Sequence, residues 1–200
     1  MALDWVSFGS AISGAVIGGL VTGYFTHKAT KDSFTNQLEQ GDKNEERLIM
    51  GLLQAIHDEI ESIFERYQDT MGVRLESLKD GEPVALYYPL VSDFFAVYNG
   101  NTFLIGRIRD HDLRKQIIKT YTLAKGIVDS FRLNNDFVAK LDMANKIFEE
   151  TGSDVHKNQL HAHYLALVDY AKTLKEAHLK LKQEVGTLLR DLRKAGVLSK

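Results

Sequence analysis

The feature that most constrains this chain is an uncharged, proline-free run close to its amino terminus. Residues 5–25 read WVSFGSAISGAVIGGLVTGYF and include five glycines. As an α-helix the run would be roughly 31 Å long, which matches the roughly 30 Å hydrocarbon core of a bilayer. Trp5 stands at one end and Tyr24 at the other, as is typical of aromatic residues at a membrane interface. The run therefore predicts a transmembrane helix.

Two alternative interpretations of the run have weaker support. A cleaved secretory signal would carry positive charge ahead of its apolar part, but the only charged side chain there is Asp4. A buried core helix seldom has so long an uncharged stretch. Lys28 and Lys31 follow the run, so the positive-inside rule predicts residues 1–4 outside and a cytoplasmic carboxyl-terminal domain.

Small residues form a continuous face along the predicted span. Two rows with four-residue spacing contain only Gly, Ala, Ser and Thr. Glycine is commoner in membrane helices generally, but in lipid such rows also let two backbones approach and associate. We therefore expect a homo-oligomer in which hydroxyls of this face would line a narrow pore, without a charged ring to select ions. The residues assigned to oligomerisation and the pore are Ser10, Gly14, Gly18, Gly19, Thr22 and Gly23.

Composition limits what the remaining residues do. The chain has no cysteine, which excludes disulfides, thiolate catalysis and cysteine-based zinc sites. Residues 32–82 hold 13 acidic and 5 basic side chains, whereas residues 107–140 hold 4 and 8, and residues 153–200 hold 5 and 9. We expect the acidic segment to lie against one or both basic segments.

Apolar residues recur at helical spacing in three long segments, which begin near Leu48, Leu113 and Ser153. Gly- or Pro-containing stretches at 79–83 and 151–154 separate them. The predicted fold is all-α: a single N-terminal transmembrane helix followed by a cytoplasmic antiparallel bundle of three long helices plus short helices. The predicted domains are the span at 5–25, a membrane-proximal connector at 26–45 with an expected break at Gly41, and the bundle at 46–200.

Residues 84–103 have no long-range periodicity and are rich in aromatic residues around Pro89. Tyr88 should be extended because it precedes proline. Ser92 and Asn101 are candidate N-caps, which predicts two short helices. The aromatic cluster is either a plug that closes one end of the bundle or a stacking platform for a planar ligand, and burial of aromatic residues favours the plug.

Motifs for catalysis and metal binding are missing from the sequence. It contains no P-loop, nucleophile-elbow or HExxH motif and no repeated Glu-x-x-His, so we expect neither an enzyme, nor a cofactor, nor a metal site. His161 and His163 point to different sides of a helix, while His57 and Glu61 share a face. His178 falls on the apolar stripe of the last helix, either as a polar residue that sets the helix register or as a pH-sensitive switch.

A basic cluster is the remaining candidate for ligand binding. Arg107, Arg109, Arg114 and Lys115 surround the start of the second long helix of the bundle. Arginine binds phosphate in a bidentate manner, so an anionic nucleotide or oligonucleotide would suit this surface. The same residues also fit a solvated helix face or a surface that matches the acidic segment.

A glycine-rich single span (Gly14, Gly18, Gly19 and Gly23) before a compact helical domain resembles the layout of small bacterial membrane effectors of antiphage defence systems. The resemblance implies subunits that assemble through the span in the inner membrane, a cytoplasmic domain that senses a nucleotide or a protein partner, and a span that then permeabilises the membrane. The alternative is a static anchor or adaptor that holds a cytoplasmic partner next to membrane lipid.

Overall fold

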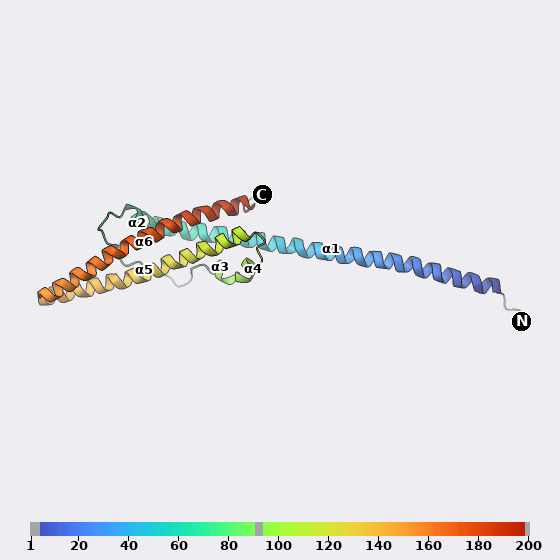
Figure 1. Cartoon of the computed structure of the whole chain (residues 1–200), viewed down its shortest axis with the longest axis horizontal. Helices are drawn as coiled ribbons and strands as arrows, with labels where there is room; N and C mark the ends of the chain where they lie inside the picture. Colours follow the sequence, from blue (N-terminus) through green and yellow to red (C-terminus); the bar gives the residue numbers. More distant parts are fainter. Residues whose placement is uncertain (1–4, 91–93, 199–200) are drawn as a thin grey trace. The chain divides into compact units, whose positions relative to one another are not determined.

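The computed structural model describes the backbone of residues 5–90 and 94–198, and in these ranges the side chains from Lys28 onward except that of Ala29. Helices account for most of this chain, and no strand occurs in the described ranges (Figure 1). The elements in order are α1 (Trp5–Tyr67), a π-helix (Gln68–Gly72), α2 (Val73–Ser77), α3 (Ala96–Gly100), α4 (Thr102–Gly106), α5 (His111–Thr151) and α6 (Asp154–Lys194). The all-α class and the bundle of long helices are confirmed.

The chain forms two compact units, Met1–Leu48 and Ile49–Lys200, and α1 contributes to both. The predicted span at 5–25 falls in α1, but its side chains, including the whole small-residue face, lie outside the described residues, as do residues 1–4. In the part of the chain whose side chains the structure describes, no helix is long and apolar enough to cross a membrane. The transmembrane helix therefore stays a prediction.

In the first unit, α1 is helical through Gly41, where the sequence predicted a break. A single glycine costs a helix only about 1 kcal/mol relative to alanine, and the neighbouring Gln, Glu and Lys residues favour the helix. The side chains of residues 30–44 are all exposed.

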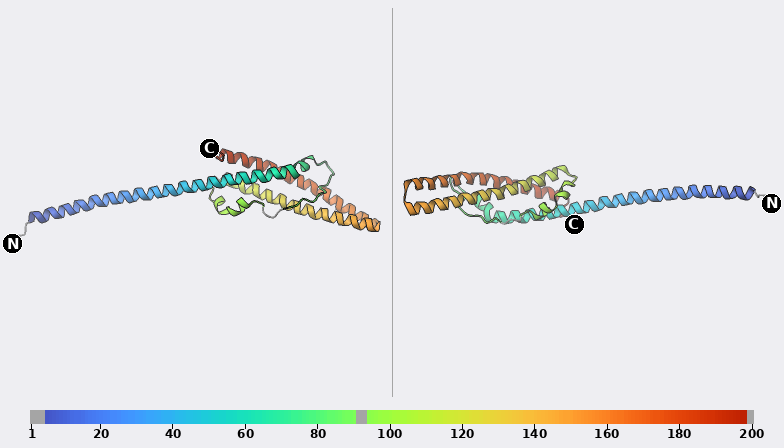
Figure 2. Two further views of the ribbon diagram at one scale, coloured as in Figure 1. Left: turned by 180° about the vertical axis from the view of Figure 1, so that it is seen from behind. Right: turned by 90° about the horizontal axis from the view of Figure 1, so that it is seen from below.

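In the second unit, α5 and α6 pack side by side as an antiparallel hairpin, with the end of α1 and α2 against them (Figure 2). Asp110 caps α5, since its carboxylate accepts the amide protons of Asp112 and Leu113 at 3.0 and 2.9 Å. Gly152 ends α5 in the left-handed conformation, with φ 59°, and the hydroxyl of Ser153 caps α6. The predicted breaks between the long helices are therefore confirmed.

A π-helical turn at Gln68–Gly72 interrupts the first bundle helix. The buried residues Tyr67, Met71 and Leu75 are spaced by four. In a straight α-helix, each step of four would rotate the side chain by roughly 40° away from the core. A π-helical turn contains one more residue than an α-helical turn, so it reduces this rotation between successive side chains. All three side chains therefore reach the core.

Two adjacent asparagines of α5 hold the extended segment after α2. Asn135 accepts the Tyr88 amide proton at 2.9 Å and donates to the Tyr88 carbonyl at 2.8 Å. Asn134 donates to the carbonyls of Val84 and Leu86 at 3.1 and 3.5 Å. Because both backbone groups of Tyr88 face Asn135, the predicted extended conformation before proline is confirmed.

The two short helices predicted in the aromatic stretch are α3 and α4, but their caps differ from the prediction. Ser92 lies outside the described residues, and Phe95 precedes α3. Asn101 precedes α4, yet its amide donates backwards to the Val97 carbonyl at 2.8 Å and so closes α3 instead of capping α4.

The apolar stripe of α6 is buried from Leu167 to Leu192, but Tyr164 nearer the hairpin tip is 41% exposed. Among the described helices of the second unit, α5 and α6 alone form this tip, so no third helix of this unit covers that face of α6 (Figures 1 and 2). The acidic first bundle helix pairs with the basic last one at Glu61 and Arg193, whose side chains are 3.0 Å apart.

Candidate functional site

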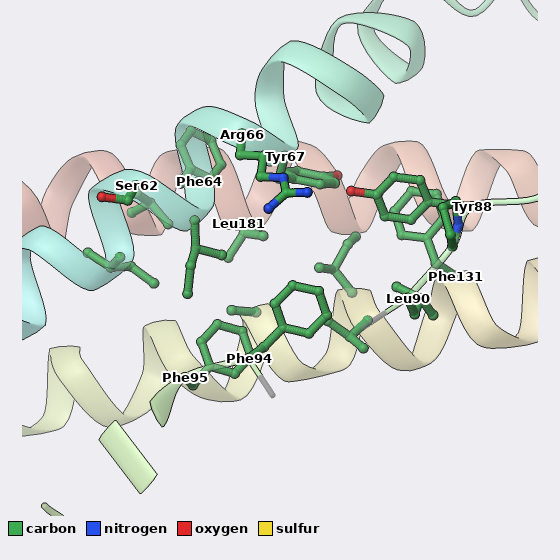
Figure 3. A pocket seen from close by; sticks show the side chains of 17 residues that line it. Ser62, Phe64, Arg66, Tyr67, Tyr88, Leu90, Phe94, Phe95, Phe131 and Leu181 are labelled. Carbon is green, nitrogen blue, oxygen red and sulfur yellow. The ribbon is translucent and has the colours of Figure 1, made fainter. Parts of the chain in front are cut away.

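An apolar cavity of about 450 Å³ lies in the second unit, between the end of α1, the segment around Pro89, α5 and α6 (Figure 3). Most of its lining is aliphatic or aromatic. The aromatic side chains that line it are Phe64, Tyr67, Tyr88, Phe94, Phe95 and Phe131. Small-molecule sites have volumes of roughly 300–1,000 Å³ and mostly apolar walls, so this cavity has the size and character of a ligand site.

Aromatic rings of the cavity lining pack against one another. Tyr88 and Phe131 have centroids 5.0 Å apart, and Tyr67 contacts Phe131 edge-on at 6.2 Å. Besides Phe131, α5 contributes the aliphatic side chains of Ala124, Ile127 and Val128 to the lining. The aromatic stretch thus lines a hollow, whereas its members Tyr87 and Phe103 are 68% and 71% exposed.

A polar network that extends from the buried Tyr67 and His178 to the exposed Glu76 and Lys182 adjoins the cavity at Tyr67. His178 is fully buried, with Nδ1 3.0 Å from the Tyr67 hydroxyl oxygen and Nε2 2.9 Å from Oε1 of Glu76. The amine of Lys182 donates to the same carboxylate oxygen at 2.6 Å, and the amide of Gln68 does so at 2.9 Å. A carboxylate only accepts, so Nε2 donates to Glu76, and in the imidazole tautomer with its single proton on Nε2 the Nδ1 atom accepts the Tyr67 hydroxyl proton.

The electrostatics of this network fix two protonation states. Hydrogen bonds from Lys182, Gln68 and His178 lower the pKa of Glu76 to about 2. Burial raises the pKa of Tyr67 above its ordinary value, and the nearby Tyr88 and Glu76 raise it further. Glu76 is therefore an anion and Tyr67 a neutral donor at physiological pH. These protonation states suit a structural hydrogen-bond network better than acid-base catalysis.

Glu59 holds the start of α3 beside Phe95, which lines the cavity. Its carboxylate accepts the amide protons of Val97 at 2.7 Å and Tyr98 at 3.2 Å, and the hydroxyl proton of Tyr121 at 2.8 Å. The first two contacts hold the start of α3 next to Phe95, whose φ of 69° is left-handed. That conformation costs a non-glycine residue about 1–3 kcal/mol, so the surrounding contacts hold the Phe95 ring in place.

The predicted ligand-binding residues lie around the connection from α4 to α5: Arg107, Arg109, Arg114 and Lys115. The guanidinium of Arg107 lies 4.7 Å from the centroid of the Phe103 ring. Arg114 donates to the Ile108 carbonyl at 2.5 Å and contacts Nδ1 of His111 at 2.9 Å. Part of the hydrogen-bonding capacity of Arg114 is thus used within the fold, and the binding assignment stays a prediction.

The sequence did not single out Arg66 and Tyr67 of the cavity, Glu76 of the His178 network, or Glu59, which holds α3. Tyr67 continues the helical spacing of apolar residues in the segment that begins near Leu48, and the two glutamates have the same local pattern as others on the acidic face. The available signal was His178 itself, because a histidine on a buried stripe requires polar partners.

No other histidine whose side chain the structure describes belongs to a metal-binding group. His57 is buried, with Nδ1 3.2 Å from Asp58 and 3.8 Å from Glu61. His161 lines a second hollow, of about 670 Å³, near the tip of the α5–α6 hairpin. Within the described part of the chain, no three His, Asp or Glu side chains are grouped to hold a metal ion.

Comparisons of the chain with protein-family models, with curated proteins and with solved structures give no match.

Proposed function

We propose that this chain is a membrane-anchored homo-oligomeric bacterial effector, which permeabilises the inner membrane under control of its cytoplasmic helical bundle. The observation that carries the proposal is the uncharged run at 5–25 with its two rows of small residues. The resemblance to membrane effectors of antiphage defence systems supports the same function.

The second unit suits a sensor because it combines a cavity with a partly buried polar network. α1 contains the uncharged run and also the core residues Ile56 and Ile60, which are at most 1% exposed. A ligand that favoured one packing of the bundle over another would therefore act on the helix that contains the predicted span. In this proposal, the second unit binds the ligand, and the helices that contain the small-residue face then rearrange to open the pore.

A static adaptor is the second candidate, and one observation favours it. The α5–α6 hairpin exposes apolar side chains near its tip, where a protein partner would bury them. They are Met143, Val155, Tyr164 and Leu165, between 41% and 65% exposed. An adaptor would use the same span as an anchor, without opening a pore.

Growth during overexpression separates the two candidates. A pore-forming effector slows growth, and a double variant Gly14→Leu, Gly18→Leu at equal expression restores it and reduces the cross-linked oligomers in membranes, because leucine prevents close backbone approach. Unimpaired growth with the intact chain favours the adaptor. An unchanged cross-linking ladder in the double variant overturns the proposed oligomerisation face.

A further inference from the structure

The cavity beside Tyr67 has one charged residue at its edge. Arg66 lies on the exposed side of α1, and Figure 3 shows its guanidinium directed along the cavity wall. In the described part of the chain, this guanidinium has no hydrogen-bond or ion-pair partner, and no Asp or Glu lines the cavity. The edge of the cavity is therefore cationic and its interior is apolar.

The hydroxyl groups near Arg66 differ in availability. The Tyr67 hydroxyl is bound to His178, while the Tyr88 hydroxyl lies 3.4 Å from the hydroxyl of Thr70, at the limit of a hydrogen bond. Tyr67 and Tyr88 direct their hydroxyl groups toward each other at one end of the cavity (Figure 3). A ligand at this edge would meet one cation and one weakly engaged hydroxyl.

We propose that this cavity binds a single-chain anionic amphiphile, with its acyl chain against the apolar walls and its carboxylate or phosphate on Arg66. Arginine pairs with either head group through parallel hydrogen bonds, and burial of the chain supplies the main driving force. A fatty acid and a lysophospholipid share this chemistry. The regulatory meaning of the site rests on the proposed sensor function, whereas the binding itself does not.

Other ligand classes fit the lining less well. A nucleoside di- or triphosphate needs several cations or a row of backbone amides, but Arg66 is the one charged group among the described lining residues. A neutral apolar molecule would gain nothing from Arg66. The combination of one cation with aromatic and aliphatic walls selects one negative charge attached to an apolar chain.

A photoactivatable fatty acid tests the proposal on the full chain in membranes. The probe carries a diazirine in its acyl chain, and mass spectrometry locates the cross-linked residues after irradiation. We expect labelling of peptides that line the cavity, such as those containing Ile63, Val128 and Leu181. Excess oleate and excess lysophosphatidylglycerol each compete if both sources bind, whereas competition by one alone identifies the source. Oleyl alcohol, which lacks the charge, competes several-fold more weakly.

Two pairs of variants separate binding from unfolding. Val128→Phe fills the cavity and should abolish labelling there, whereas Val155→Phe at an exposed site of α6 should not. Arg66→Gln should weaken labelling about fivefold, as expected for a partly exposed ion pair. Arg74→Gln removes an exposed arginine that does not line the cavity and should leave labelling unchanged.

Labelling that avoids the cavity, or that survives Val128→Phe in full, overturns the proposal. Equal competition by oleyl alcohol, or no effect of Arg66→Gln, overturns the assignment of the anionic head group. None of these outcomes involves growth or membrane permeability, so failure of this site and failure of the proposed effector function are distinguishable.

Discussion

His178 and Tyr67 lie 111 positions apart in the sequence, yet Nδ1 of the imidazole and the phenol oxygen are 3.0 Å apart in the buried core. The contact joins α6 to the last residue of α1, immediately before the π-turn. If α6 slid by one turn, both polar groups would remain buried without partners, at a cost of about 1–3 kcal/mol each. The pair therefore fixes the register between the first and last bundle helices.

Replacement of Tyr67 by phenylalanine tests this register contact. Tyr67→Phe keeps the ring but leaves Nδ1 of buried His178 without a partner. We expect a loss of about 1–3 kcal/mol in the free energy of unfolding, which corresponds to several degrees in Tm for a domain of this size. Thermal unfolding followed by circular dichroism measures it, with Tyr87→Phe at an exposed site as the control. Equal Tm values for the two variants would show that the contact stabilises nothing.

The lowered pKa of Glu76 predicts how the free energy of unfolding depends on pH in the acidic range. Its folded pKa of about 2 lies below the ordinary 4.5, so its contribution is complete above about pH 4.5 and is lost as the pH falls toward 2. Glu76→Gln should therefore flatten the decline in stability below about pH 5, while Glu65→Gln, on an exposed face, should not. The remaining decline includes Glu184, whose pKa is lowered by Lys119. Parallel curves for the wild type and Glu76→Gln would refute the effect.

Asn135 should control the order of the extended segment. Asn135→Ala removes both hydrogen bonds to the Tyr88 backbone, so we expect faster amide exchange over residues 84–90 and a loss of about 1–3 kcal/mol in stability. Hydrogen exchange with mass spectrometry measures the first effect. Asn145→Ala, at an exposed position of the same helix, provides the comparison. Unaltered exchange at Tyr88 would mean that the aromatic packing alone holds the segment.

Glu59 should hold the start of α3. Glu59→Gln leaves one acceptor oxygen for three donors, from Val97, Tyr98 and Tyr121, and should lower stability by about 1–2 kcal/mol. The amides of Val97 and Tyr98 should then exchange faster, while those of α5 remain protected. If α3 kept its full protection, the strained backbone at Phe95 would have another support.

The sequence predicted those parts of the fold that depend on local signals. Apolar spacing predicted the long helices, and the breaks at 79–83 and 151–154 marked their ends, because capping chemistry acts within a few residues. The π-turn was not predicted, because the steps of four around Met71 also fit an α-helix within the usual tolerance. The fold alone brings Glu59 to α3 and Glu76 to His178, so no local pattern could distinguish these two glutamates from their acidic neighbours. In the sequence, Arg66 is likewise one of several charges on an exposed helix face, and only the fold places the aromatic segment beside it.

Membrane potential in bacterial cells that express the full chain tests the proposed effector most directly. At matched expression, we predict depolarisation by the intact chain and none by the Gly14→Leu, Gly18→Leu double variant. A second double variant, Gly41→Leu, Gly51→Leu, adds the same bulk at α1 glycines with open space around them, so it should still depolarise the membrane. A normal potential in cells with the intact chain, or equal depolarisation by all three proteins, would contradict a pore built on the small-residue face.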